Sequence, residues 1–307
     1  MKIFCKLNKF AAILGFMLVF YSLPLKAQNA AFNENHPLYF GNPSQACADK
    51  QNSYDNYLME KPQYVLSYNK SALIPNWVAW HLQSTDIGSI KRVNDFRADD
   101  SLPTGWYKVK KSDYKFTMYG FDRGHVCPSA DRTSNTQDNS ATFFMTNMVP
   151  QAPDCNRIVW MHLETFERKF AFAGNEVYIF AGVYGRGGTG SRGYFTEIPA
   201  AQNLAIAVPQ YEWKILLVLP ESGNDFERLC SLVRQKDESV KVYAFFIPNE
   251  QGCQNIPTAD KSAKDENGFE GENDFLYYKC SVDYIEEKTG YDFFSLLPQD
   301  VQDELEK

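Results

Sequence analysis

The sequence of 307 residues lacks several features that would assign it to a familiar class. It has no CxxC pair, no zinc-like cysteine cluster, no internal repeat and no long low-complexity run, and only four histidines. Its longest uncharged and mostly apolar run, residues 10–25, has 16 residues, fewer than the roughly 20 that a membrane-spanning helix needs. A repeat array and a structural zinc domain are therefore excluded, and any histidine that carries chemistry must be one of very few.

The N-terminus has the layout of a secretory signal peptide over residues 1–27. Lys2, Lys6 and Lys9 precede the apolar run, and Ala27 offers a plausible cleavage site after it. Leu25 is larger than the small residue usually preferred near such a site, so an uncleaved membrane anchor is the alternative. We expect export to the periplasm or the extracellular space, and no stable membrane partner if the signal is cleaved.

Cysteine usage agrees with export. Six cysteines follow residue 27, and an even number in an exported protein favours disulfides. They are Cys47, Cys127, Cys155, Cys230, Cys253 and Cys280. Cys253 and Cys280 flank a polar loop and are the first pair that we predict, while Cys127 and Cys155 are either bridged or buried thiols.

The charge is unevenly distributed along the chain. Residues 1–27 contain four lysines and no acidic residue, so their removal changes the net charge from −7 to −11. That total is unusual for a protein that meets nucleic acid. Residues 92–192 nevertheless carry a net charge of +2, whereas residues 193–307 carry −12. A local positive surface is therefore compatible with the sequence, and strong general affinity for polyanions is not expected.

Hydrophobic patterning predicts one α+β domain over residues 61–307, preceded by a loose polar arm at residues 28–60. A helix is predicted from Asp154, as its cap, to Ala173, with Gly174 as the stop. Strands are predicted within residues 63–84 (two strands joined by a turn), 113–121, 176–185, 213–220 and 241–249.

The predicted helix carries two different stripes. Asn156, Trp160, Glu164 and Arg168 are spaced four apart and should lie on one slanting line. The other stripe is apolar and should face the core: Val159, Leu163, Phe166 and Phe170. Taken alone, Glu164 and Arg168 would be an ordinary surface ion pair worth about 0.3–0.5 kcal/mol. Asn156 at the helix start is better suited to a cap or a ligand than to the helix itself.

The stretch "FDRGH", residues 121–125, supplies what phosphodiester hydrolysis needs beside that stripe. The reaction requires a base for water, positive charge on the phosphate and help for the departing oxygen. His125 can act as the base near neutral pH, and Arg123 or Arg168 can bind phosphate oxygens in a planar fork. Asn156 could hold a hard divalent ion, because Mg²⁺ keeps most of its waters and accepts few protein oxygens.

Three motifs carry a family resemblance: "DRGH" at 122–125, "TNMVPQ" at 146–151 and "NRIVWMHLETFERK" at 156–169. Together they closely resemble the DNA/RNA non-specific endonuclease family, which includes secreted bacterial nucleases and mitochondrial endonuclease G. The resemblance spans roughly residues 60 to 298. It implies the ββα-metal (His-Me finger) nuclease fold, an α+β structure with a central, mostly antiparallel sheet and flanking helices.

The resemblance also implies a role for each site residue. His125 is implied as the general base, and Asn156 as the sole protein ligand of Mg²⁺, for which Mn²⁺ or another divalent ion could substitute. Glu164 is implied to order metal-bound water, and Arg123 and Arg168 to contact phosphate.

Asp122 and Asn147 are implied as supporting residues near the site. The arginine that the family has upstream of the motif aligns best with Asn94, with Arg92 and Arg97 nearby. Because this chain has Asn94 in place of the family's arginine, the role of that arginine is not assigned to a residue here.

We therefore expect a metal-dependent endonuclease that hydrolyses DNA and RNA to 5′-phosphate products. One alternative is a nuclease restricted to a single type of nucleic acid, and another is an exported nucleic-acid-binding protein with weak or no catalysis. The sequence also allows a homodimer. His81 and His162 are predicted to be structural, and no cysteine nucleophile is expected.

Overall fold

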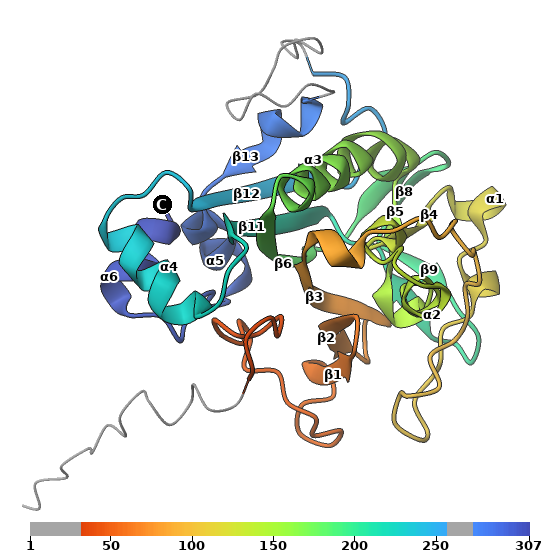
Figure 1. The fold of residues 1–307 in the computed structure, drawn as a ribbon. Coiled ribbons are helices and arrows are strands. Elements are labelled where there is room, and N and C mark those ends of the chain that lie inside the picture. The colour runs from red at the N-terminus through yellow and green to blue at the C-terminus, as the bar shows by residue number, and fades with distance from the viewer. Residues whose placement is uncertain (1–31, 257–272) are drawn as a thin grey trace, which may run out of the picture.

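The computed structural model describes residues 32–256 and 273–307 and is built on a seven-stranded sheet (Figure 1). The strand order is β1-β2-β3-β6-β11-β12-β13, and every neighbouring pair is antiparallel. The strands are β1 Tyr57–Lys61, β2 Tyr64–Asn69, β3 Ile74–Leu82, β6 Asn175–Tyr184, β11 Tyr211–Pro220, β12 Lys241–Pro248 and β13 Lys279–Cys280. The predicted central antiparallel sheet is confirmed, and five of its strands lie where β-branched and aromatic residues predicted them.

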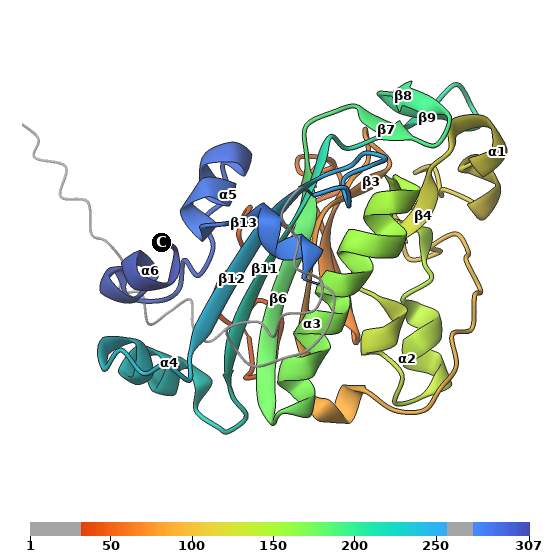
Figure 2. The ribbon, with the colours of Figure 1, turned by 90° about the horizontal axis from the view of Figure 1, so that it is seen from above.

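Both faces of the sheet are buried, and each has its own core. In β6, Val177 and Ile179 belong to one hydrophobic cluster, whereas Tyr178 and Phe180 belong to the other, because successive side chains of a strand point to opposite faces. Figure 2 shows α3 (Trp160–Phe172) against one face and α4 (Asp225–Arg234), α5 (Val282–Thr289) and α6 (Gln299–Leu305) against the other. The predicted α+β class with flanking helices is confirmed.

Smaller elements gather on the α3 side. The strands β4 (Asp122–His125) and β5 (Met148–Gln151) form a separate antiparallel ribbon, with α2 (Thr136–Ala141) between them in the chain. Two further ribbons are β7 (Gly188–Gly190) with β8 (Gly193–Phe195), and β9 (Glu197–Pro199) with β10 (Ala205–Ala207). Within the described ranges, no helix has both the length and the apolar character required to span a bilayer.

The strand predicted at residues 113–121 is wrong, because the centre of that segment forms the short helix α1, Phe116–Tyr119. Lys115 (φ 39°) and Gly120 (φ 75°) are both left-handed and flank this helix. Gly120 also has to be glycine, since a Cβ there would lie 2.5 Å from the backbone nitrogen of Arg192. Alternation of residue types alone could not reveal these two backbone reversals.

The described part of the segment predicted as a loose arm is packed. Leu38 and Phe40 are almost fully buried in the core on the α4 side, and the segment ends in β1. Its polar residues are used locally: Asn42 Nδ2 donates to the carbonyl of Ala46, and Asn56 Nδ2 to the carbonyl of Ser44. The predicted signal peptide, residues 1–27, lies outside the described residues.

Candidate active site

The β4–β5 ribbon fixes the start of the site. Asp122 lies opposite Gln151 and His125 opposite Met148. Gly124, between them in the motif, packs so tightly against Gln151 that an added Cβ would lie 2.6 Å from the Gln151 Cβ. Glycine is therefore required at this position by packing, so Gly124 needs no chemical role to explain its place in the DRGH motif.

His125 lies in an aromatic and cationic environment with only 6% of its surface exposed. Its ring stands edge-on to Phe143 at 4.7 Å and to Phe96 at 5.5 Å between centroids. Burial, and then the charges of Arg92 and Arg123, hold the pKa of His125 well below its usual value. The imidazole is thus neutral at neutral pH, and its Nε2 is buried without a hydrogen-bond partner among the described groups.

Arg92 is the arginine that the sequence comparison could not assign. Its Nη2 lies 3.5 Å from His125 Nδ1, and its Nη1 donates to Ser129 Oγ at 2.8 Å. Asn94, the aligned position, accepts a hydrogen bond from Arg92 Nε at 2.9 Å. Arg97 instead lies over the ring of Phe144, 4.0 Å from its centroid. Asn94 therefore holds a guanidinium rather than providing one.

Asp122 orients Asn156. Its Oδ2 accepts a hydrogen bond from Asn156 Nδ2 at 2.9 Å, and its two oxygens also accept from Arg157 Nε and Nη2, each at 2.7 Å. A carboxylate only accepts hydrogen bonds, so the amide NH₂ of Asn156 must face it. The amide oxygen is then left for another partner, and no hydrogen bond to it occurs among the described residues.

The helix that carries Asn156 is not regular. Residues Cys155–Val159 form a π-helical turn, and the α-helix proper begins only at Trp160. Asp154 stands at the predicted cap position but makes no side-chain cap hydrogen bond, because its Oδ2 accepts hydrogen bonds from Gly252 N (3.0 Å) and Gln254 Nε2 (3.1 Å). The wide turn includes Asn156, and such π-turns are frequent at functional sites.

Glu164 and Arg168 remain one turn apart on α3 and are both partly buried. Arg168 Nη1 donates to Oδ1 of the buried Asp131 at 2.9 Å. Burial raises the pKa of Glu164, while the charges of Lys214 and Arg168 act in the opposite direction. The pair is therefore part of a desolvated charge network that includes Asp131, and not the ordinary surface ion pair considered from sequence.

Comparisons with known proteins identify the family to which the chain belongs. The family model described as "DNA/RNA non-specific endonuclease" matches residues 42–300. The chain belongs to this family.

Relatives and a solved structure agree with the assignment. A nuclease from a Nostoc species is 40% identical over 288 residues, which cover 92% of this chain and 91% of that protein. Human mitochondrial endonuclease G is 27% identical over 199 residues, 63% of this chain and 65% of that protein. The chain is therefore an endonuclease.

The structural comparison concerns the fold. A crystal structure of the EndoG/EndoGI complex, described under the mechanism of EndoG inhibition, matches with a TM-score of 0.59 and 21% identity. The match covers 85% of this chain and 91% of that chain. It supports the predicted ββα-metal architecture, in which β4, β5 and α3 supply the two strands and the helix.

Asn147, predicted to support the endonuclease site, directly precedes β5. Its Oδ1 accepts from Cys127 N at 2.9 Å, and its Nδ2 donates to the carbonyls of Cys127 (2.8 Å) and Thr142 (2.9 Å). The buried amide thus fixes the backbone two residues after His125. The Cys127 side chain is a buried free thiol, which answers the question that the sequence left open for it.

The other cysteines of the endonuclease also differ from expectation. All six that follow residue 27 are free thiols in the structure, so the predicted Cys253–Cys280 pair is not formed. Cys253 instead makes a side-chain hydrogen bond with Cys155.

Buried charges beneath the site were not predicted from sequence. Lys214 of β11 and Glu167 of α3 are both fully buried, with 2.8 Å between Nζ and Oε2, and Lys214 Nζ lies 4.6 Å from the ring centroid of Trp160. Glu167 follows Leu163 by four residues and so falls on the buried face of α3. Lys214, a lysine in a predominantly apolar strand, was the available signal for its partner.

The two remaining histidines near these elements are structural, as predicted. His81 Nε2 lies 2.9 Å from Glu176 Oε2, and His162 Nδ1 lies 2.9 Å from Asp274 Oδ1. Both carboxylates are buried, so each histidine is committed to a contact with a buried carboxylate.

Proposed function

We propose that the protein is a metal-dependent, sugar-non-specific endonuclease that hydrolyses DNA and RNA to 5′-phosphate products, with His125 as the general base. The observation that carries the proposal is the connection between β4 and the start of α3. Asp122, three residues before His125, holds the Asn156 amide by its NH₂ group. This hydrogen bond connects the strand that carries His125, whose Nε2 is buried without a partner among the described groups, to Asn156, whose amide oxygen has no partner among the described residues.

The residues at this point fit a divalent ion such as Mg²⁺ or Mn²⁺. Asn156 would hold it through Oδ1, since the NH₂ group is already occupied by Asp122, and Mg²⁺ requires few protein oxygens. When bound, the ion would supply Lewis-acid stabilisation of the phosphate and of the departing 3′-oxygen.

The chain's own residues would perform the remaining tasks. His125 is neutral and would take a proton from water at Nε2 as the water oxygen attacks phosphorus. Glu164 would hold and orient solvent as a hydrogen-bond acceptor. Within the described part of the chain, the buried Nε of Arg123 has no hydrogen-bond partner, and Arg123 and Arg168 would bind phosphate oxygens.

Arg92 would hold the imidazole ring of His125 from its Nδ1 side and keep it unprotonated. The proposed contacts of Arg123 and Arg168 involve phosphate and not the bases, which suits action on both DNA and RNA with little sequence preference.

We also propose that the protein is exported, supported by the signal-like layout of residues 1–27.

Cleavage assays test the proposal. Plasmid DNA and RNA are incubated with the purified protein in Mg²⁺ or in chelator, and His125→Ala is expected to lower the rate by about 10²–10⁴-fold. His36→Ala, which removes a histidine far from this motif in sequence, is the matched control and should retain activity. Equal rates for wild type and His125→Ala would refute the base assignment, and cleavage in chelator would refute the metal requirement.

The same assay separates the alternatives. Cleavage of only one nucleic acid would favour the restricted nuclease. Binding of both without cleavage in any lane would favour the binding protein.

A further inference from the structure

Three carboxylates converge on the face of the sheet opposite the candidate active site. Asp283 and Glu286 belong to α5, and Glu306 follows α6 directly. One oxygen of each side chain lies within 4.8 Å of those of the other two. The backbone joins the same two elements, because Asp283 N donates to the carbonyl of Glu306 at 2.9 Å.

Glu306 is the unusual member of this acid cluster. Only 7% of its surface is exposed, and its Oε1 is buried without a hydrogen-bond partner. A buried carboxylate without a cation is costly, so the arrangement favours a positive partner.

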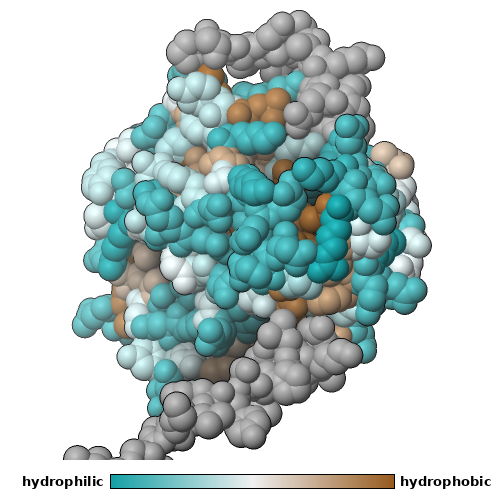
Figure 3. All heavy atoms as spheres, turned by 90° about the vertical axis from the view of Figure 1, so that its left-hand side faces the viewer, coloured by the Kyte–Doolittle hydropathy of each residue, from teal (hydrophilic) through white to brown (hydrophobic). Residues whose placement is uncertain are grey.

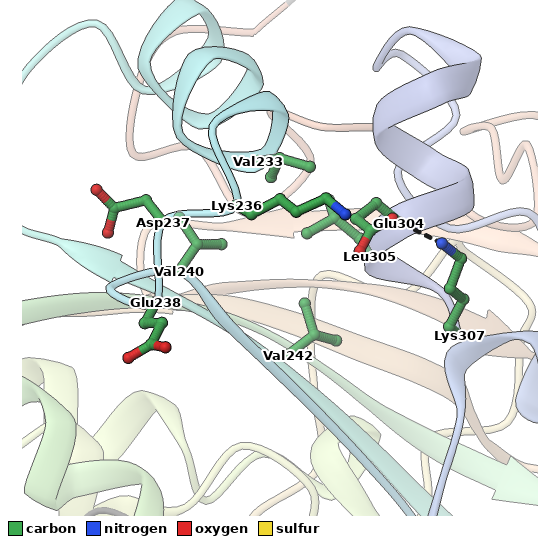
Figure 4. Close-up of a pocket in the computed structure, with 9 residues that line it drawn as sticks. All are labelled: Val233, Lys236, Asp237, Glu238, Val240, Val242, Glu304, Leu305 and Lys307. Carbon is green, nitrogen blue, oxygen red and sulfur yellow. Dashed lines mark hydrogen bonds and ion pairs between the residues drawn. The ribbon is translucent and has the colours of Figure 1, made fainter.

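Glu304, at the same end of α6, is a carboxylate that does have a cationic partner. Figure 4 shows Glu304 with Lys236 and Lys307 in the shallow pocket between the ends of α4 and α6, with 2.6 Å between Glu304 Oε2 and Lys307 Nζ. The hydrogen bond and charge of Lys307 lower the pKa of Glu304. Among the described residues, no lysine, arginine or histidine pairs in this way with a member of the acid cluster.

We propose that Asp283, Glu286 and Glu306 bind a hard divalent cation, Ca²⁺ in preference to Mg²⁺, which ties the end of α6 to the start of α5. All three ligands are carboxylates, and oxygen-only sites suit Ca²⁺ or Mg²⁺ and not zinc or copper. Two oxygens that share one Ca²⁺ at about 2.3–2.6 Å can lie up to about 5 Å apart, whereas Mg²⁺ at about 2.0–2.1 Å limits this separation to about 4.2 Å. Three oxygens that all lie within 4.8 Å of one another can share one Ca²⁺, and three carboxylates exceed the one or two that Mg²⁺ usually takes.

The position of the cluster indicates a structural role. The α4–α6 side, which faces the viewer in Figure 3, is largely hydrophilic, and the exposed Asp283 leaves room for water to complete the coordination shell. The sheet separates the cluster from β4 and α3 (Figure 2). Calcium should therefore change stability and leave the rate of phosphodiester cleavage in Mg²⁺ unchanged.

Thermal unfolding and calorimetry of the full chain test this site. After chelation and dialysis at pH 8, Ca²⁺ is titrated as the chloride. At a free concentration near 100 times the dissociation constant, the Tm of the wild type should rise by about 5 °C. Glu306→Gln should lose this rise, and without Ca²⁺ it should be at least as stable as the wild type because a repulsive charge is gone. Glu304→Gln is the matched control and should keep the full calcium response.

Two additional variants keep the outcome interpretable. Asp283→Asn alters an exposed ligand and should weaken Ca²⁺ binding about tenfold or more even if Glu306→Gln fails to fold. Asn156→Ala should keep the calcium response, which separates this site from the proposed catalytic ion. A wild type with no Ca²⁺-dependent change in Tm or heat of binding, or a Glu306→Gln or Asp283→Asn variant with an undiminished response, would overturn the proposal.

Discussion

On the α3 face of the sheet, Glu167 is paired with Lys214 and Asp131 with Arg168, whereas on the opposite face Glu306 has no cationic partner among the described residues. Both faces bury carboxylates, and on the opposite face Arg228 of α4 neutralises Glu176 and Asp225. Around the candidate active site, Lys214 and Arg168 hold their partner carboxylates in place before substrate arrives. Glu306 differs from these paired carboxylates, because we propose that its neutralising charge comes from solution.

Replacing Lys214, the cation that pairs with Glu167 on the α3 face, should make Glu167 resemble the unpaired Glu306. Lys214→Met would leave Glu167 buried without a partner, as Glu306 is now, and should lower the free energy of unfolding by about 3–5 kcal/mol. Urea denaturation at pH 7 measures the effect. Lys214→Met combined with Glu167→Leu should recover most of the loss, since an apolar pair carries no unpaired charge. A single variant as stable as the wild type would show that Lys214 does not compensate Glu167.

The orientation of Asn156 offers a sharper test on the same face. Asp122→Asn places an amide where a carboxylate now accepts hydrogen bonds from Asn156 and Arg157. Loss of such a supporting contact typically costs about 10–100-fold in metal affinity or activity. The Mg²⁺ concentration for half-maximal cleavage should therefore rise. Asp95→Asn, which disturbs the exposed pair with Arg97, should leave this concentration unchanged, and an unchanged value in Asp122→Asn would argue against Asn156 as the ligand.

The smallest expected effect concerns pH. Arg92 helps to hold the pKa of His125 below its usual value, so the neutral base and the activity should persist below pH 6.5 in the wild type. Arg92→Ala should raise this pKa and move the acid limb of the kcat/KM profile to higher pH, by up to about one unit. Arg97→Ala, whose guanidinium lies on Phe144 instead, should not move the limb. A shift to lower pH in Arg92→Ala would contradict the electrostatic account.

The sequence was most informative where the determinants are local. The β-branched and aromatic content of β6 and β11 located these strands, and the apolar spacing of α3 correctly placed Leu163 and Phe166 in the core. The family motifs also predicted a shared site for His125 and Asn156. Their roles stay predictions until the assays above are done.

Long-range contacts explain what the sequence could not predict. The pairing of Lys214 with Glu167 joins two elements 47 residues apart, and the capture of Asp154 by Gly252 and Gln254 joins segments about one hundred residues apart. The sequence left the choice between Arg92 and Arg97 open, because an alignment compares positions and does not show that Arg92 lies beside His125 whereas Arg97 lies on Phe144. The packing of Leu38 and Phe40 was hidden by the polar residues around them.

The two edge strands of the central sheet affect the tendency of the protein to aggregate at high concentration. An exposed edge strand is a template on which another chain can add and begin aggregation. Here one outer strand, β13, has only two residues, and the other, β1, is bridged at Tyr57 by Cys47 of the preceding segment. The segment that precedes β1 thus guards the sheet against self-association, so truncation before residue 57 should promote aggregation even where the catalytic residues are untouched.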